Sequence, residues 1–382
     1  MSIASFLSGK FPSSGKKVRY AVVGLGDIAQ AAFMPAVKQT GNSEITALVT
    51  GDAEKAKALS KAYGVDAVYS YEQFPELLKS GLIDAVYLAT PNWRHAEFAV
   101  PALKAGIHVF TEKPMETTTA KCREIMEAKK TSSAKLMVAY RLHFEPATLS
   151  TIEMIREGKL GEVTMFSSAF CQMVDPENHR TKHGIEAGPL FDMAPYPINA
   201  ARYVFGDEPT EVVSAVAVRH PEAGIGDLDD TISATLRFPG NRLAQFMVSY
   251  YGSTVDSFFV VGTKGSIQMN PGFGYGMPLE QHITIEDKKS HKAHKQTDQF
   301  SGELSYFSHC VLENIEPEPD GEEGYADVRV LEGIRKALET GQPQRLEPFT
   351  RSRRINPETQ EERFSPTRVK PKEVNAANPS DR

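Results

Sequence analysis

Lys113 is placed for chemistry rather than for packing. It belongs to Glu112-Lys113-Pro114, which follows the short apolar run 107–110. In an open α/β sheet, ligands bind at the carboxyl ends of the strands. We therefore expect the ammonium group of Lys113 at a binding cleft, provided that other residues with suitable chemistry fold beside it.

Asp192 and Tyr196 could supply that chemistry from the second half of the chain. They lie four residues apart in segment 189–204, whose pattern predicts a helix, so their side chains would share one face. Oxidation of a carbinol needs a base for the hydroxyl proton, and a tyrosine serves only where a cation such as Lys113 favours its ionised form. The structural alternative is that Asp192 caps a helix and Tyr196 is a core aromatic residue.

A glycine-rich turn after the first predicted strand, 18–23, indicates a dinucleotide site. The motif is Gly24-x-Gly26-x-x-Ala29. Gly24 permits a tight turn, Gly26 lets a pyrophosphate approach the backbone, and the next helix offers free N–H groups. A purely structural turn is the alternative, which the alternating strands and helices that follow disfavour. The residues assigned to this part of the site are Gly24, Leu25, Gly26, Asp27 and Ile28.

The end of the second predicted strand, 45–50, bears on which dinucleotide is bound. An NAD site would place a carboxylate there for the ribose 2′-hydroxyl. This strand instead ends in Thr50-Gly51-Asp52, with Lys55 three residues on. Threonine and lysine suit a 2′-phosphate, whereas Asp52 lies two residues past the usual place and is expected to cap the next helix. The pattern favours NADP over NAD.

Strands and helices alternate through residues 18–139, which predicts a parallel, doubly wound sheet of the Rossmann type. The expected strands are 18–23, 45–50, 67–69, 85–89, 107–110 and 136–139, and the expected helices run to about residue 39 and over 53–63, 72–79, 94–105 and 117–130.

After Pro146 the pattern changes to runs of strands, which predicts an α+β part with a large, mostly antiparallel open sheet. The expected strands are 162–170, 211–218, 231–238, 243–251, 257–261, 266–269 and 283–285, and the expected helices are 147–157, 189–204 and 325–339. We divide the chain into an N-terminal arm (1–17), an NADP-binding domain (18–145), a substrate-binding and oligomerisation domain (146–350) and a polar C-terminal tail (351–382).

Composition excludes several classes of protein. The net charge of −6 argues against a nucleic-acid coat, and no apolar run reaches the roughly 18 residues of a membrane span. Cys122, Cys171 and Cys310 are few and far apart, and the N-terminal apolar patch 3–7 is short, so we expect a cytoplasmic protein. No metal site is expected, because His179 and His183 lack an acid and a third ligand.

Taken together, these motifs resemble the glucose–fructose oxidoreductase / inositol dehydrogenase (Gfo/Idh/MocA) family over about residues 18–345. The glycine turn, Glu112-Lys113-Pro114, and an aspartate followed four residues later by histidine or tyrosine occur in the expected order. The chain is most similar to the glucose–fructose and aldose–aldose oxidoreductase branch, on segments 50–57, 139–143 and 321–324. The lead-in Glu186-Ala187-Gly188-Pro189 departs from the family pattern and is expected to reshape the sugar pocket.

The resemblance implies an NADP enzyme that oxidises an aldose at its anomeric carbon to a lactone. The cofactor would stay bound and be recycled by reducing a second sugar, the Lys113–Pro114 bond would be cis, and the C-terminal sheet would form the interface of a homodimer or homotetramer. The alternatives are a dehydrogenase of a cyclic polyol or sugar with dissociable NAD(P), and a non-catalytic nucleotide-binding sensor, which the intact Lys113, Asp192 and Tyr196 argue against.

Site residues follow from the same resemblance. Lys113, Asp192 and Tyr196 are the implied catalytic residues, and with Arg180 they would contact the substrate. The remaining implied cofactor contacts are Thr50, Lys55, Tyr71, Thr90, Pro91, Asn92, His95, Glu112, Lys113 and Arg141.

Overall fold

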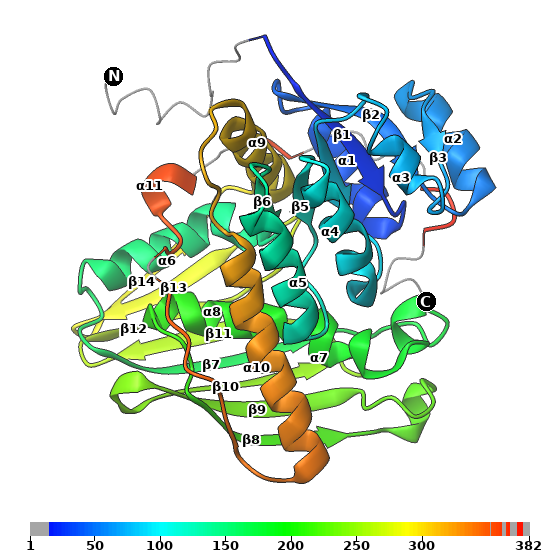
Figure 1. The fold of residues 1–382 in the computed structure, drawn as a ribbon. Coiled ribbons are helices and arrows are strands. Elements are labelled where there is room, and N and C mark those ends of the chain that lie inside the picture. Colours follow the sequence, from blue (N-terminus) through cyan, green and yellow to red (C-terminus); the bar gives the residue numbers. More distant parts are fainter. Residues whose placement is uncertain (1–14, 352, 361–363, 367–372, 377–382) are drawn as a thin grey trace.

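The computed structural model describes residues 15–351, 353–360, 364–366 and 373–376 (Figure 1). Within these residues the strands form two sheets, one of six strands and one of nine. Most of the expected N-terminal arm, residues 1–14, lies outside the described part of the chain, as does much of the expected tail. No described helix has the length and apolar character needed to cross a membrane.

The first sheet is parallel throughout and has the strand order β3-β2-β1-β4-β5-β6. This is the order of a Rossmann fold, whose ligand crevice lies where the order reverses, here between β1 and β4. Runs such as Ala-Val-Tyr-Leu in β4 are fully buried because helices cover both faces. The doubly wound sheet is confirmed. Its strands are β1 (Val18–Val23), β2 (Ser43–Val49), β3 (Val68–Tyr69), β4 (Ala85–Leu88), β5 (His108–Thr111) and β6 (Leu136–Val138).

Helices connect these strands, and side-chain caps set where several of them begin. The carboxylate of Asp52 accepts from the N–H groups of Glu54 and Lys55 and starts α2, which ends at Gly64 in the left-handed region. The helix expected up to residue 39 contains a π-helical segment, η2. The helical elements are η2 (Ala29–Phe33), α1 (Met34–Val37), α2 (Ala53–Tyr63), α3 (Phe74–Leu77), η3 (Asn92–Arg94), α4 (His95–Lys104), α5 (Thr119–Lys130) and η4 (Arg141–Phe144).

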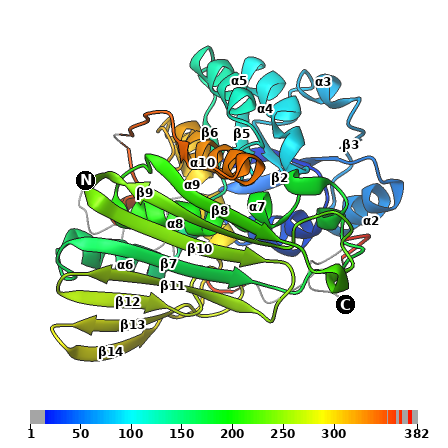
Figure 2. The ribbon, with the colours of Figure 1, turned by 90° about the horizontal axis from the view of Figure 1, so that it is seen from below.

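The second sheet has the order β14-β13-β12-β11-β7-β10-β9-β8-β15, and only β7 and β10 pair in parallel among its described strands. Side chains of β9 and β10 alternate between buried and exposed, so one face packs on helices and the other is open (Figure 2). The mostly antiparallel open sheet is confirmed. Its strands are β7 (Val163–Cys171), β8 (Glu211–Val218), β9 (Thr231–Phe238), β10 (Arg242–Ser249), β11 (Val255–Gly262), β12 (Gly265–Met269), β13 (Glu280–Ile285), β14 (Lys288–Ala293) and β15 (Gln344–Arg345).

Helices of the second half pack between the two sheets. Val330 of α10 belongs to the core of the second sheet, whereas Val328 on the same helix packs into the core of the first. The long helix α10 therefore ties the two halves together, as Figure 1 shows. The elements are α6 (Pro146–Arg156), η5 (His179–Thr181), η6 (Gly184–Glu186), α7 (Pro189–Asp192), α8 (Pro195–Phe205), η7 (Pro221–Ala223), η8 (Pro239–Asn241), α9 (Gln299–Leu312), α10 (Gly321–Thr340) and α11 (Pro357–Gln360).

The prediction of a single helix over 189–204 is wrong, because the structure has two helices there, α7 and α8. Pro195 and Pro197 have no N–H to donate to the preceding turn, so the hydrogen-bond ladder is interrupted at Met193 and Ala194. The backbone at the break stays in the right-handed helical region. Asp192 and Tyr196 consequently still point into the same space, although no continuous helix joins them.

Candidate functional site

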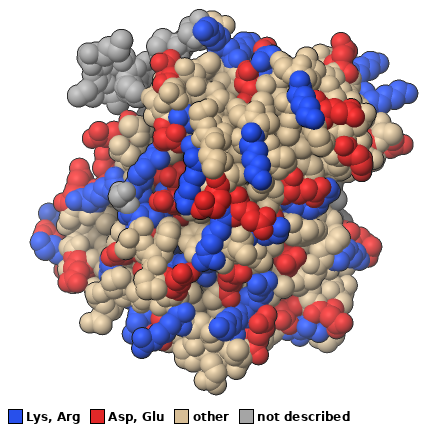
Figure 3. Space-filling model, viewed as in Figure 1, with Lys and Arg blue, Asp and Glu red and all other residues tan. Residues whose placement is uncertain are grey.

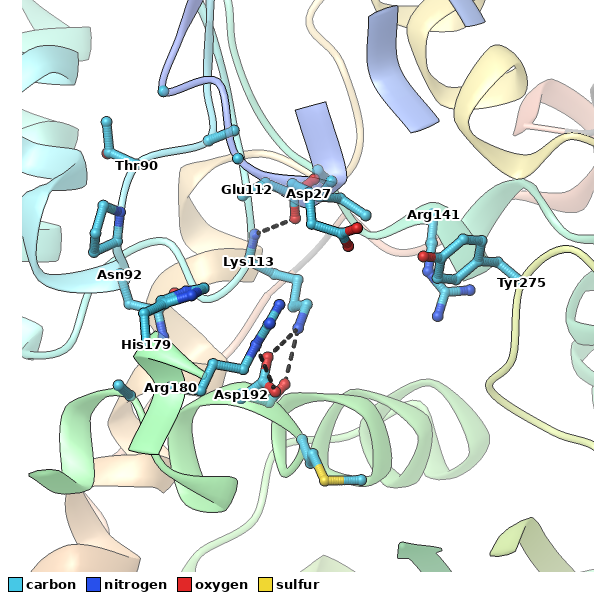
Figure 4. Close-up of a pocket in the computed structure, with 18 of the residues that line it drawn as sticks. Asp27, Thr90, Asn92, Glu112, Lys113, Arg141, His179, Arg180, Asp192 and Tyr275 are labelled. Atoms are coloured by element: carbon cyan, nitrogen blue, oxygen red, sulfur yellow. Dashed lines mark hydrogen bonds and ion pairs between the residues drawn. The ribbon is translucent and has the colours of Figure 1, made fainter. Parts of the chain in front are cut away.

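A cavity of about 790 Å³ lies at the carboxyl ends of the first sheet and extends to the helices of the second half. Its volume is in the usual range of ligand-binding pockets. Figure 4 shows Thr90 and Glu112 from the first half facing Arg180 and Asp192 from the second. The structure brings all but one of the predicted site residues to its wall: Gly24, Leu25, Gly26, Asp27, Ile28, Thr50, Lys55, Tyr71, Thr90, Pro91, Asn92, Glu112, Lys113, Arg141, Arg180, Asp192 and Tyr196.

The glycine turn has the geometry that a pyrophosphate requires. Gly24 has a φ of 89°, and a Cβ there would come within 2.6 Å of the Ala89 carbonyl oxygen. A Cβ on Gly26 would meet nothing within 4 Å, so open space lies beside this backbone on the cavity wall. The turn thus offers room and helical N–H groups to a dinucleotide.

The other end of the cofactor cleft is formed by the loop after β2. Thr50 and Lys55 line the cavity there, together with the ring of Tyr71. Asp52 does not line it, because its carboxylate caps α2, as expected from its position in the sequence. A hydroxyl and an ammonium group, and no carboxylate of this loop, therefore line this end of the cavity.

Lys113 and Asp192 meet at the centre of the cavity. The Lys113 Nζ donates to the Asp192 carbonyl oxygen at 2.8 Å and lies 3.7 Å from its Oδ1. The Lys113–Pro114 bond is cis, as expected. The Asp192 carboxylate also accepts from the Tyr250 hydroxyl at 2.8 Å and lies 3.2 Å from the Arg180 Nε. Asp192 is not the helix cap of the structural alternative.

These partners keep Asp192 ionised. Burial alone would raise the pKa of its carboxyl group, but the Arg180 and Lys113 cations outweigh burial and hold the pKa below its usual value. Arg180 has a further donor to offer, because its Nη1 is buried without a hydrogen-bond partner among the described residues. An ionised acceptor and an unused donor suit the hydroxyl groups of a polar ligand.

Tyr196 lies between two cations. Its ring centroid is 4.4 Å from the Lys113 Nζ and 5.0 Å from the Arg141 guanidinium carbon. Arg141 is held in place by the carbonyl oxygens of Phe273 and Gly274, at 2.6 and 3.3 Å, and by the side chain of Gln299. Arg141, expected only as a cofactor contact, therefore also belongs to the surroundings of the tyrosine.

His95 is the predicted cofactor contact that the structure contradicts. Its ring is completely buried outside the cavity wall, with Nε2 3.0 Å from the Thr90 carbonyl oxygen and Nδ1 3.0 Å from that of Pro114. Burial lowers the pKa of His95 to about 4, so the imidazole is neutral. It links the backbone after β4 to the turn that carries Lys113 and thus acts indirectly on the site.

A buried acid pair joins the cavity wall to the interior behind it. Glu112 accepts from the Tyr87 hydroxyl at 2.6 Å, whereas neither carboxyl oxygen of Glu303 on α9 has a hydrogen-bond partner among the described residues. Burial, followed by the nearby Glu112 charge, raises the pKa of Glu303 well above its usual value. The native state therefore holds a proton on Glu303 that the unfolded chain releases above a pH of about 4.3.

This proton makes stability fall with rising pH. Because the native state binds more protons than the unfolded state, the free energy of unfolding should decrease by up to about 1.4 kcal/mol per pH unit in wild type. Glu303→Gln carries no such proton, so its stability relative to wild type should rise between pH 5 and pH 8, as measured by urea denaturation. The matched control is Glu339→Gln at an exposed position of α10, and parallel pH profiles of all three proteins would contradict the assignment.

Sequence reasoning missed much of the cavity wall contributed by the second half. Thr254 and Tyr275 lie on loops whose spatial position a strand pattern does not give, and the Tyr275 ring faces Arg141 with its centroid 5.2 Å from the guanidinium carbon. The glycine-rich run 272–276 was the available signal for a ligand-side loop. The further cavity residues are Ala89, Trp93, Ala139, Phe170, Gln172, Met173, His179, Ala187, Met193, Thr254, Asp256, Gly274, Tyr275, Met277 and Phe300.

Both halves of the chain match known families. Residues 18–140 match the family described as "Oxidoreductase family, NAD-binding Rossmann fold", and residues 149–268 match the GFO/IDH/MocA C-terminal domain. A D-xylose 1-dehydrogenase [NADP(+)] of Haloarcula marismortui is 31% identical over 338 residues, which cover 86% of this chain and 93% of the relative.

Two solved structures are also similar. An aldose–aldose oxidoreductase from Caulobacter crescentus in complex with glycerol has 33% identity and a TM-score of 0.81, covering 86% of this chain and all of the other. A 3-ketoreductase from Actinomadura kijaniata in complex with NADP and TDP-benzene has 26% identity and a TM-score of 0.77, covering 84% of this chain and 98% of the other.

Proposed function

Because this chain belongs to the Gfo/Idh/MocA oxidoreductase family, we propose that it is an NADP-dependent sugar oxidoreductase that oxidises an aldose at its anomeric carbon to a lactone. The observation that carries the proposal is the arrangement of Lys113, Asp192 and Tyr196 at the centre of the cavity, beside the turn that suits a dinucleotide. The relatives that are named as aldose enzymes support the choice of substrate.

Tyr196 accepts the substrate proton in this proposal. Its phenolate oxygen takes the proton of the anomeric hydroxyl while the C1–H bond breaks, with Lys113 and Arg141 beside the ring. Bound NADP supplies the acceptor for the hydride. The electron pair of the O–H bond becomes the second bond of the lactone carbonyl, and the Lys113 ammonium group stabilises the developing charge on that oxygen.

Asp192 and Arg180 are proposed to orient the sugar. The Asp192 carboxylate is fixed by Tyr250, Arg180 and Lys113, so it can accept from a ring hydroxyl without moving. The unpartnered Arg180 Nη1 can donate to a second ring oxygen. Because the pKa of Asp192 is lowered, this residue is a hydrogen-bond acceptor here rather than a proton donor.

Cofactor choice is tested at Thr50. Thr50→Asp would place a carboxylate against the 2′-phosphate, and a like-charge contact of several kcal/mol should lower kcat/KM for NADP by about 100-fold. Activity with NAD, which lacks that phosphate, should fall far less. Steady-state kinetics with both cofactors measure the change, with Lys57→Asp, at an exposed position of α2, as the matched control. Equal losses with NADP and NAD would contradict the proposed 2′-phosphate site.

Recycling of a retained cofactor by a second sugar is the further candidate activity. A contact of the C-terminal segment with residues that adjoin the glycine turn and the Thr50 loop, described below, favours it. A panel of aldoses given to the enzyme as isolated, and scored for lactone and alditol together, distinguishes the possibilities. Lactone with alditol supports recycling, lactone with free NADPH supports a dehydrogenase, and neither product from any aldose or cyclic polyol would indicate a nucleotide-binding sensor.

We also propose that the open face of the second sheet joins copies of the chain in a homodimer or homotetramer. Figure 2 shows this face without covering helices, and Figure 3 shows charges of both signs interspersed on another face of the molecule. A contiguous apolar sheet surface of this kind is unusual on a monomer. The large apolar side chains more than 40% exposed on it are Met165, Val216, Val218, Leu243, Met247, Val255 and Phe259.

Phe259→Lys tests this interface. A lysine within the apolar face should weaken self-association by at least about tenfold, because a buried unpaired charge costs more than 1.4 kcal/mol. Light scattering across a dilution series measures the mass. Thr340→Lys at the exposed end of α10 is the control, and an unchanged mass of the Phe259→Lys protein at all concentrations would contradict the proposal.

A further inference from the structure

The described part of the C-terminal tail returns to the first half of the molecule. Val374 pairs with Gln30 of η2 through two hydrogen bonds: its N–H donates to Oε1 and its carbonyl accepts from Nε2, both at 2.9 Å. Gln30 is fully buried, and its Nε2 also donates to the Leu25 carbonyl oxygen at 2.8 Å. The tail is thus connected to the glycine turn by one shared amide group.

The next residue is connected to the start of α2, the helix that follows the Thr50 loop. The Asn375 Nδ2 donates to the Asp52 Oδ2 at 3.1 Å and to the Glu54 Oε2 at 2.9 Å. Asn375 has a φ of 46°, a left-handed conformation that asparagine adopts more readily than most residues. Figure 1 shows this red segment beside α2, whose first turn carries Lys55.

The two attachments lie on either side of the nucleotide end of the cavity. Leu25, which accepts from Gln30, lines the cavity on the glycine turn. Asp52 donates its N–H to the Thr50 hydroxyl at 3.1 Å and accepts from the Lys55 N–H, so it sets the positions of the two residues that face the 2′-phosphate.

We propose that residues Val374–Asn375 form part of the NADP-binding site, as a clasp that fixes the glycine turn to the 2′-phosphate loop and slows release of the cofactor. The clasp rests on the NADP site of the proposed function. It stabilises the bound state by keeping the two walls at a fixed spacing, which a 2′-phosphorylated dinucleotide needs in order to contact both. Its effect should therefore be larger for NADPH than for NADH.

Two variants test the clasp. Ending the chain after Glu373 removes it, and Asn375→Asp keeps the shape and the tolerance of positive φ while placing a third carboxylate against Asp52 and Glu54. Stopped-flow nicotinamide fluorescence should show NADPH leaving about tenfold faster from both proteins, the factor that corresponds to 1.4 kcal/mol. The control is Glu358→Gln, whose side chain is exposed elsewhere in the same tail.

The outcomes separate the clasp from folding and from the proposed activity. If the truncated protein also has a lower melting temperature without cofactor, the release rate of the Asn375→Asp protein is the deciding measurement, because this variant keeps the whole chain. NADPH release within twofold of wild type in both variants would overturn the clasp, as would equal acceleration of NADPH and NADH release. Because release is measured without sugar, an enzyme that oxidises no aldose refutes the proposed activity and leaves this test intact.

A second, independent observation concerns three metal-ligand side chains at the end of the open sheet face. His282 and His291 are direct partners on β13 and β14, with ring centroids 4.6 Å apart. Glu280 lies two residues before His282, on the same face, and its Oε2 is 2.8 Å from the His291 Nε2. One ligand atom from each side chain lies within 4.8 Å of the others.

We infer that this cluster binds a divalent cation of the zinc class. Two imidazoles and one carboxylate suit Zn²⁺, and a tetrahedral ion with bonds of about 2.0–2.2 Å leaves its fourth position open. Both histidines are exposed, so their side chains can rotate toward a shared ion. Lys289 lies on the same face and opposes binding, whereas the Lys292 Nζ turns to the other face and donates to Ser150.

Zinc titration by isothermal calorimetry tests this site. Wild type should bind one ion and gain thermal stability, because the ion cross-links the edge strand to its neighbour. His282→Gln and His291→Gln should each weaken binding by at least about tenfold, and His309→Gln on α9 should bind as wild type does. No zinc binding by wild type, or equal binding by all four proteins, would overturn the site.

Discussion

Tyr196→Phe is expected to lower kcat for aldose oxidation by about 10²–10⁴-fold, the usual contribution of a positioned acid–base group. The phenylalanine ring keeps the contact with Lys113 and Arg141, so the fold and the cofactor site should not change. Only the oxygen that takes the substrate proton is lost. Steady-state kinetics and NADPH fluorescence titration, performed on the same preparation, separate loss of chemistry from loss of cofactor.

The control for this change is Tyr251→Phe. Tyr251 is half-buried outside the cavity wall, where its ring contacts His220, so removal of its hydroxyl should leave kcat unchanged. A Tyr196→Phe enzyme with more than a tenth of wild-type kcat would assign the base to another group. His179 would then be considered first, because it lines the cavity and burial, with the neighbouring Arg180 cation, lowers its pKa to about 4, which leaves a neutral imidazole.

Lys113→Ala should lower kcat by about 10³-fold, because the ammonium group stabilises the negative charge that develops on the substrate oxygen. Added methylammonium should restore part of the activity by occupying the space of the lost side chain. Lys182→Ala, at an exposed ion pair with Glu177, is the matched control.

An unchanged activity of the Lys113→Ala enzyme would also have a structural explanation. If Lys113→Ala retained the kcat of wild type, Arg141 alone would suffice as the cation beside Tyr196, and Lys113 would serve only to position Asp192 through its carbonyl oxygen. A rise in KM for the sugar without a change in kcat would identify that positioning role and would contradict the charge-stabilising role of Lys113.

Local sequence features predicted the elements whose limits depend on local chemistry. The expected limits of β1, α2, β8 and β9 are those of the structure. In α2 the cap at Asp52 and the left-handed glycine at Gly64 define both ends. The glycine turn and Lys113 follow strands whose buried, apolar sequences are unambiguous, so their side of the cavity could be placed without coordinates.

Elements that depend on distant partners could not be predicted. Helix α9 contains Gly302 and several serines. It is stable because Phe307 packs on Phe110 and Ser308 contacts Tyr20. Both partners belong to the first sheet and lie almost 200 residues or more before α9 in the sequence. Strand β14 has only exposed side chains, and its pairing with β13 alone makes it a strand. The helix α10 also begins earlier than expected, at Gly321, where Asp320 caps it.

The candidate site likewise combines features set by local sequence with features set by distant partners. The partnership of Asp192 with Lys113 could be proposed from family motifs, but its bonds to Tyr250 and Arg180 depend on where β10 ends and where the loop after β7 folds. The cofactor contact predicted for His95 was wrong. The position of His95 in the sequence gives no sign that its ring turns away from the cavity into the protein interior. The acid pair of Glu112 and Glu303 likewise joins segments that only the packed structure brings together.

Transfer of deuterium from an aldose labelled at C1 tests directly whether the anomeric carbon gives its hydride to the nicotinamide. The enzyme is mixed with NADP⁺ and the labelled sugar, and the reduced nicotinamide and the sugar product are analysed by mass spectrometry. Oxidation at the anomeric carbon predicts that the nicotinamide carries the deuterium and that the product is the lactone or its hydrolysed acid. Reduced nicotinamide without deuterium, formed while the sugar keeps its label, would contradict the account.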